Sequence, residues 1–153
     1  MTFKSVTSNI KFPMADVHEP NIRSYNMSQI RAKNTKPEIL VRKFLYSNGF
    51  RYRLHVHNLP GKPDVVLPKY NSIVLVHGCF WHVHEGCEYF KIPDTRTEWW
   101  KAKLYGNKER DKTNISRLRD MGWNVIIVWE CELKQDKQEK TLTDLIQKLE
   151  ENR

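Results

Sequence analysis

Long apolar runs are absent from this sequence of 153 residues. No stretch reaches the roughly 18 consecutive apolar residues that a membrane-spanning helix needs. The first 20 residues also lack the apolar segment of a secretory signal peptide. We therefore expect a cytoplasmic protein without a membrane partner. The length is sufficient for one domain with a full hydrophobic core.

Cysteine is scarce, and the three residues of this type are Cys79, Cys87 and Cys131. Three cysteines cannot all pair within one chain. In a reducing compartment such residues are usually thiols or metal ligands. We therefore expect no disulfide framework.

Acidic residues are too few to balance the basic ones. The chain has 26 Lys and Arg against 18 Asp and Glu, which gives a net charge of +8. This balance favours a polyanionic partner, most often a nucleic acid, although a merely basic protein can share it. The segment 21–36 has four basic residues and no acid, namely Arg23, Arg31, Lys33 and Lys36. It could contact phosphate or be a solvated tail.

The order of apolar patterns predicts one α/β domain with a mixed central sheet flanked by helices. Residues 1–20 show no clear periodicity, so we expect a flexible N-terminal extension before a domain over residues 21–153. Helical spacing over 35–50 predicts a helix with Thr35 as N-cap, Glu38 as its capping-box partner and Gly49 at its end. Almost continuous apolar runs at 62–68 and 72–78 predict two central strands, and 123–130 predicts a third buried strand.

Two more helices are expected in the second half of the chain. Residues 97–122 are helical in parts, with Ile115, Leu118 and Met121 on the core face and Gly122 as C-cap. Residues 143–152 predict a short amphipathic helix near the C-terminus.

The stretch 74–87, VLVHGCFWHVHEGC, combines residue types that a hydrophobic core does not need. Cys79, His84 and Cys87 lie within nine residues, and Cys131 follows the third predicted strand. If that strand lies parallel to and beside the second one, Cys131 reaches the same end of the sheet. Three cysteines and one histidine would then form a tetrahedral zinc site, which would fix a loop with no core of its own. The alternative is three buried thiols beside an incidental histidine.

Several other polar residues have both an ordinary and a catalytic interpretation. Asp64 opens a predicted strand, where a sheet would hold its carboxylate as a Mg²⁺ ligand, but Pro–Asp is also common in turns. Glu38 is explained by helix capping, and Asp111 by a surface salt bridge. His77 and His82 could be packed or solvated residues, or catalysts beside a metal site.

Two pairs of adjacent large rings, Phe80–Trp81 and Trp99–Trp100, stand in polar surroundings. Flat rings can insert between bases and unstack them, at the lowest cost at a mismatched step. Aromatic core filler is the alternative, and within a pair one ring could pack while the other faces DNA.

Five segments together resemble the very short patch repair (Vsr) endonucleases. These are NMSQIRAKNTKPE, GFRYRLHVHNLPGKPDVVLPKY, VHGCFWHVHEGC, TEWWKAKLYGNKERD and GWNVIIVWEC, and the resemblance runs from about Asn21 to Leu133. It implies a restriction-endonuclease-like fold and a bacterial, nucleoid-associated, monomeric enzyme. That enzyme would nick double-stranded DNA beside a T:G mismatch that arises from deamination of 5-methylcytosine.

The resemblance also implies two metals, site residues and partners. The products would carry 5′-phosphate and 3′-hydroxyl ends, and the partners would be mismatch-repair proteins and, functionally, a cytosine methyltransferase. Catalytic Mg²⁺ would be bound by Asp64 and, since Val76 stands where some members have threonine, by the Val76 backbone carbonyl. The remaining matches are catalytic His82, Asp111, His77 and Glu38, structural Zn²⁺ ligands Cys79, His84, Cys87 and Cys131, and DNA-wedging rings Phe80, Trp81 and Trp100.

Two rival functions remain at this point. A non-catalytic, zinc-stabilised DNA-binding module would need the basic charge and the rings but neither Asp64 nor His82. A nickase of broader mismatch specificity would use the same residues on more substrates.

Overall fold

The structure is a computed structural model that describes residues 33–153. The expected extension over residues 1–20 lies outside the described residues, as do Arg23 and Arg31 of the basic segment, so these expectations stay predictions. The elements, in chain order, are α3 (Lys36–Ser47), β1 (Arg53–Leu54), β2 (Val65–Leu67), η2 (Pro68–Tyr70), β3 (Ser72–His77), α4 (Thr97–Asp120), β4 (Asn124–Trp129), η3 (Glu130–Leu133) and α5 (Lys137–Glu151).

The four strands form one mixed sheet in the order β1-β2-β3-β4. β1, β2 and β3 are antiparallel neighbours, and β3 and β4 run parallel. In the parallel pair Ser72 lies opposite Asn124 and His77 opposite Trp129. Both the mixed sheet and the parallel placement of the third expected strand beside the second are therefore confirmed.

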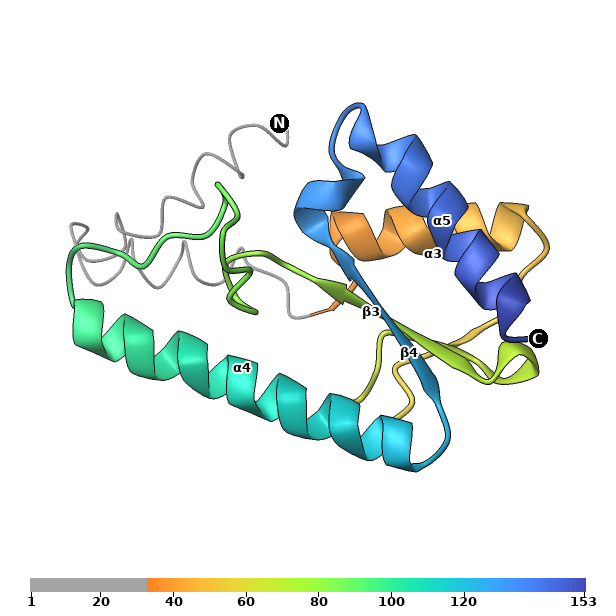
Figure 1. The fold of residues 1–153 in the computed structure, drawn as a ribbon, viewed down its shortest axis with the longest axis horizontal. Helices are drawn as coiled ribbons and strands as arrows, with labels where there is room; N and C mark the ends of the chain where they lie inside the picture. The colour runs from red at the N-terminus through yellow and green to blue at the C-terminus, as the bar shows by residue number, and fades with distance from the viewer. Residues whose placement is uncertain (1–32) are drawn as a thin grey trace.

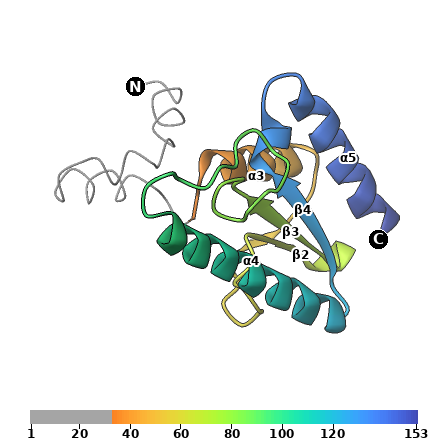
Figure 2. The same ribbon diagram turned by 60° about the vertical axis from the view of Figure 1, so that its left-hand side comes forward.

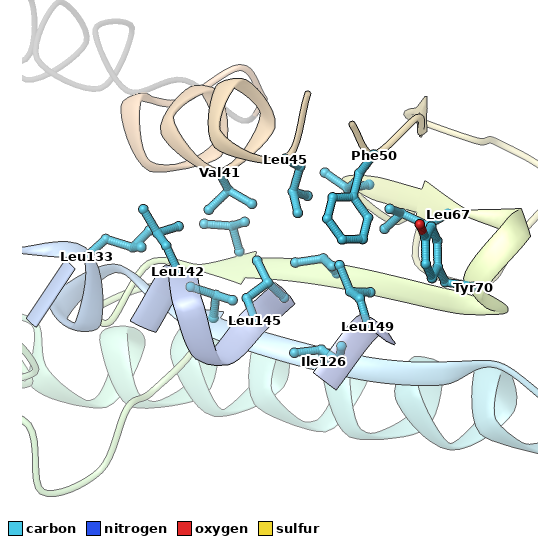
Figure 3. Close-up of a cluster of buried hydrophobic side chains, with 14 residues drawn as sticks. Val41, Leu45, Phe50, Leu67, Tyr70, Ile126, Leu133, Leu142, Leu145 and Leu149 are labelled. Carbon is cyan, nitrogen blue, oxygen red and sulfur yellow. The ribbon is translucent and has the colours of Figure 1, made fainter. Parts of the chain in front are cut away.

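The sheet is covered on both faces, with α3 and α5 on one side and α4 on the other (Figures 1 and 2). Strand side chains alternate between the faces. Val74 and Ile126 pack with α3 and α5, whereas Ile73 and Val125 pack with Leu118 of α4. Figure 3 shows the larger of these two cores, where Leu45, Leu145 and Leu149 meet the sheet with their side chains completely buried or nearly so.

Helix α3 begins as the sequence predicts. Thr35 is its N-cap, and the Thr35 hydroxyl accepts a 3.5 Å hydrogen bond from the Glu38 backbone N–H. The Glu38 carboxylate accepts from the backbone N–H of Asn34 rather than Thr35. The side-chain half of the predicted capping box is therefore wrong by one residue, and the same Glu38 oxygen also accepts from a second partner described below.

Helix α4 differs from the expectation of a segment helical only in parts, because it is one continuous helix of 24 residues. Leu118 is buried and Ile115 packs beside it, as predicted, but Met121 is 55% exposed. Met121 is not a core residue because the helix ends at Asp120 and the chain turns away through Gly122, whose φ is +94°. No helix within residues 33–153 has the length and apolar character needed to cross a membrane.

Candidate active site and metal centre

The segment 78–96, which follows β3, is fixed against α4. Asn107 donates a 3.1 Å hydrogen bond from its side-chain amide to the Trp81 carbonyl, and Lys108 forms a 2.8 Å ion pair with Glu85. Val83 and Leu104 belong to one buried apolar cluster that joins the segment to the N-terminal half of α4. The expectation of a loop without a core of its own is therefore wrong, because α4 extends far enough to supply one (Figure 1).

Four potential metal ligands converge at the end of the parallel strand pair. We call Cys79, His84, Cys87 and Cys131 the ligand cluster, and one ligand atom from each lies within 4.8 Å of the others. The Cys131 Sγ and His84 Nδ1 atoms are 3.5 Å apart. Ligand atoms around a tetrahedral zinc ion stand about 3.5–3.8 Å apart, so the cluster needs little movement to close on such an ion.

Burial favours the protonated form of two thiols in the ligand cluster. Burial raises the pKa of the Cys79 thiol well above its ordinary value, and burial raises the pKa of Cys131 too. All three cysteines are free thiols. A bound cation would favour the deprotonated thiolates over the neutral thiols, because thiolates are the form that binds metal.

A second polar group lies where the same strands end. His82 Nδ1 is 2.6 Å from an Asp111 carboxylate oxygen, and both side chains are partly exposed. The His82 ring stacks on the His77 ring, with centroids 3.9 Å apart and planes 4° from parallel. Asp111 lies one helical turn after Asn107 on α4, so the helix that holds the loop also supplies the carboxylate. The surface salt bridge considered for Asp111 is thus a contact to a histidine.

His77 is a buried histidine in an unusual environment. Burial, followed by the charge of His82, lowers its pKa to about 4. Its Nδ1 atom has no hydrogen-bond partner within residues 33–153. The lowered pKa therefore favours the neutral form of the His77 ring at physiological pH.

Asp64 lies at the entry to β2 and contacts β3. Its carboxylate accepts a 3.0 Å hydrogen bond from the Val76 backbone N–H. Its pKa is raised to about 6, mainly by burial and to a smaller extent by the charge of Glu38, against the opposing effects of the Val76 hydrogen bond and the charges of His82 and Arg42. Asp64 is therefore mostly buried, bonded to β3 and close enough to Glu38 and His82 for their charges to affect its pKa.

Glu38 has a partner that sequence reasoning missed. The guanidinium of Arg42, one turn later on α3, lies 2.8 Å from the Glu38 carboxylate, and both side chains are almost fully buried. Arg42 also donates to the Asn34 side chain at 2.8 Å and contacts His55. The four-residue spacing between Glu38 and Arg42 was the available sequence signal.

The aromatic pairs each contain one buried and one more exposed ring. Phe80 and Trp100 are buried, whereas Trp81 is partly exposed and Trp99 is 47% exposed. Phe80 meets Trp81 and Trp100 edge to face, at 5.0 Å and 5.5 Å between centroids. The expectation that one ring of each pair packs while the other stays accessible is therefore confirmed for burial, and Trp99 is the accessible ring of its pair.

Comparison with known proteins finds related nucleases. The family model described as DNA mismatch endonuclease Vsr matches residues 15–88. The Type II nicking enzyme V.NmeAIP of Neisseria meningitidis is 49% identical over 121 residues, which are 79% of this chain and 86% of that protein. The DNA mismatch endonuclease Vsr of Escherichia coli is 44% identical over 138 residues, 90% of this chain and 87% of that protein. The Type II nicking enzyme V.XorIIP of Xanthomonas oryzae is 46% identical over 120 residues, 78% of this chain and 88% of that protein.

Proposed function

The chain belongs to the Vsr family of DNA mismatch endonucleases and is a strand-nicking nuclease, and from this premise we propose its substrate, metals and mechanism. The proposed substrate is duplex DNA with a T:G mismatch, cut on one strand to leave 5′-phosphate and 3′-hydroxyl ends. The mismatch is proposed from the similarity to DNA mismatch endonucleases, whereas the observation that most supports hydrolysis of the DNA strand is the presence of Asp64 and the His82–Asp111 pair in one region of the fold.

Oxygen ligands for Mg²⁺ are available beside Asp64. A strand residue directs its N–H and C=O to the same neighbour, so the Val76 carbonyl faces the side on which its N–H bonds Asp64. Carboxylate and carbonyl oxygens suit this hard cation, and a positive charge would favour the ionised form that burial of Asp64 opposes. When bound there, Mg²⁺ would polarise the phosphate and lower the pKa of its water.

His82 is the proposed proton acceptor. Because its Nδ1 atom lies against the Asp111 carboxylate, Nδ1 carries a proton and Nε2 is left to accept one from the attacking water. Asp111 fixes the tautomer and stabilises the imidazolium that forms. His77 is held neutral by burial and is proposed to contact the scissile phosphate, while Glu38 lines the site next to Asp64.

We propose Zn²⁺ as the ion of the ligand cluster and a restriction-endonuclease-like architecture for the α/β fold. Three thiols and one imidazole are a typical structural zinc set, and here their ligand atoms lie within 4.8 Å of one another. The ion would tie the loop that carries His82 to the end of β4, where Cys131 lies. It would act in this way without touching substrate.

DNA is the proposed partner, in accord with the net charge of +8. Of the three proposed wedging rings, Trp81 is partly exposed, whereas Phe80 and Trp100 are buried and would have to leave their positions to contact a base. We further propose a monomer in the bacterial cytoplasm, associated with the nucleoid. Functional links to a cytosine methyltransferase and to mismatch-repair proteins belong to the same proposal.

The test is a nicking assay with Mg²⁺ on matched duplexes and on every mismatch in several sequence contexts. A single-strand break confined to T:G supports the proposal, and equal nicking of all mismatches supports the broader nickase. A non-catalytic DNA-binding module would cut none of them. The His82–Asp111 contact disfavours that module, since DNA binding alone needs no such pair.

A further inference from the structure

Trp129, the last residue of β4, is partly buried and has contacts unlike those of the rings in the apolar cores. It belongs to none of the three apolar clusters formed within residues 33–153. Its indole stacks on the His84 ring, with centroids 4.0 Å apart and planes 2° from parallel. The same indole meets the His77 ring edge to face at 5.2 Å and 74°. Trp129 therefore touches one member of the ligand cluster and one histidine of the candidate active site.

These contacts are part of a continuous column of rings. From the ligand cluster the column runs through His84 to Trp129, and then to His77. His77 stacks on His82, and His82 bonds Asp111. The parallel register sets the middle of the column, because it places Trp129 directly opposite His77.

Packing rather than hydrogen bonding orients the centre of this column. His77 Nδ1 is buried without a hydrogen-bond partner in the described part of the chain, so that atom does not fix the plane of its ring. Two ring contacts bear on that plane, namely the edge-to-face contact with Trp129 and the parallel stack on His82. Removal of the indole would leave His77 free to tilt, and His82 would lose the surface against which it stacks.

We propose that Trp129 is a positioning residue that couples the ligand cluster to the catalytic histidines. It holds the His84 ring in the plane suited to metal binding, and it holds His77 in the plane that supports His82. The proposal rests on the proposed function, in that His82 and His77 are taken to act on the phosphate. It predicts that a change at residue 129 reaches His82, which Trp129 does not contact.

The experiment compares Trp129→Leu, Trp129→Phe and Trp123→Leu in the zinc-loaded protein. Trp123 is the matched control, because it precedes β4 and packs on the α4 side of the sheet, away from the histidines. Three properties are measured: single-turnover nicking at saturating DNA, the rate of zinc release to a chelator, and the NMR resonances of the His82 ring.

We expect Trp129→Leu to nick about tenfold more slowly or worse, since small misplacement of a reacting group has large effects on rate. DNA affinity should stay within about twofold of the parent, because Trp129 contacts histidines rather than phosphate. Zinc release should be faster and the His82 resonances should move. Trp129→Phe should restore most of each property, since a smaller ring can still stack.

Parent-like nicking, zinc release and His82 resonances in Trp129→Leu would overturn the proposal. Equal changes in Trp123→Leu would also overturn it, because they would indicate general loss of stability. If the parent itself does not nick, the proposed function fails. The His82 resonances and the zinc release rate still decide whether Trp129 couples the two groups.

Discussion

An Asp111 carboxylate oxygen on α4 lies 2.6 Å from His82 Nδ1 in the loop after β3. This contact joins two residues that are 29 positions apart in the chain. We predict that Asp111→Asn reduces nicking by about a hundredfold or more, because an amide holds the imidazole in the wrong tautomer and stabilises its cation poorly. Single-turnover nicking and DNA affinity would be measured on the same protein. Asp120→Asn, an exposed change on the same helix, is the control and should nick normally. Equal rates for the two variants would remove the His82–Asp111 pair from the mechanism.

The ligand cluster predicts about one zinc ion per chain in the purified protein. Cys131→Ser should lower the zinc content and the thermal unfolding temperature together, since Cys131 is the only ligand that reaches the loop from the end of β4. His57→Asn, which changes an exposed histidine outside the cluster, should retain its zinc. Full zinc occupancy in Cys131→Ser would exclude Cys131 from the site.

We predict that ionisation of Asp64 makes the free energy of unfolding depend on pH when no Mg²⁺ is present. Its pKa is raised from 3.8 to about 6 in the folded state, mainly by burial. The folded chain then holds this proton more tightly than the unfolded chain, so its stability falls as the pH rises from about 4 through 6. Asp64→Asn removes that loss and keeps an acceptor for the Val76 N–H.

At pH 7.5 the variant should therefore have a free energy of unfolding higher than that of the parent by at most about 3 kcal/mol, and it should unfold at a higher temperature. The two proteins should be nearly equal at pH 4. Thermal unfolding at both values checks this prediction. A variant less stable than the parent at pH 7.5 would mean that Asp64 is a structural turn residue.

We predict that removal of the partly exposed Trp81 ring lowers the discrimination between mismatched and matched DNA. Trp81→Ala should reduce the preference for mismatched over matched duplex by about fivefold, since stacking of a base on an aromatic ring contributes about 1 kcal/mol or more. Trp99→Ala, which removes a more exposed ring that is not among the proposed wedging rings, is the control. Affinities for both duplexes would be measured, and equal losses on both in Trp81→Ala would make it a packing residue.

Much of the sheet could be predicted because its strands are short and apolar almost throughout. The runs at Val65–Leu67, Ser72–His77 and Asn124–Trp129 are recognisable without their neighbours. The ligand cluster was predictable only on the condition that the last two of these run parallel. The parallel pairing of these two strands is a long-range property that the sequence does not determine locally. In the structure the two strands are parallel, with His77 opposite Trp129.

Other features depend on contacts that no local pattern carries. The first half of α4 packs Trp100 and Leu104 against a loop instead of the sheet, so its apolar residues lack the spacing of an ordinary surface helix. Which of Trp99 and Trp100 is buried depends on the direction in which that helix enters. The Glu38–Arg42 pair follows helical spacing, but its burial beside Asp64 requires the folded sheet.

Single-turnover nicking of a T:G duplex by Asp64→Asn, with Mg²⁺ present, tests the central claim most directly. Asparagine keeps the shape of the side chain but removes the charge that a hard cation needs. The DNA affinity of the same protein is measured in parallel, with Asp120→Asn as the control for loss of one negative charge. We predict nicking at least about a hundredfold slower than the parent, with DNA binding that is retained or tighter, because the metal contributes several kcal/mol to the transition state. Nicking by Asp64→Asn at the parent rate would contradict the active site described above.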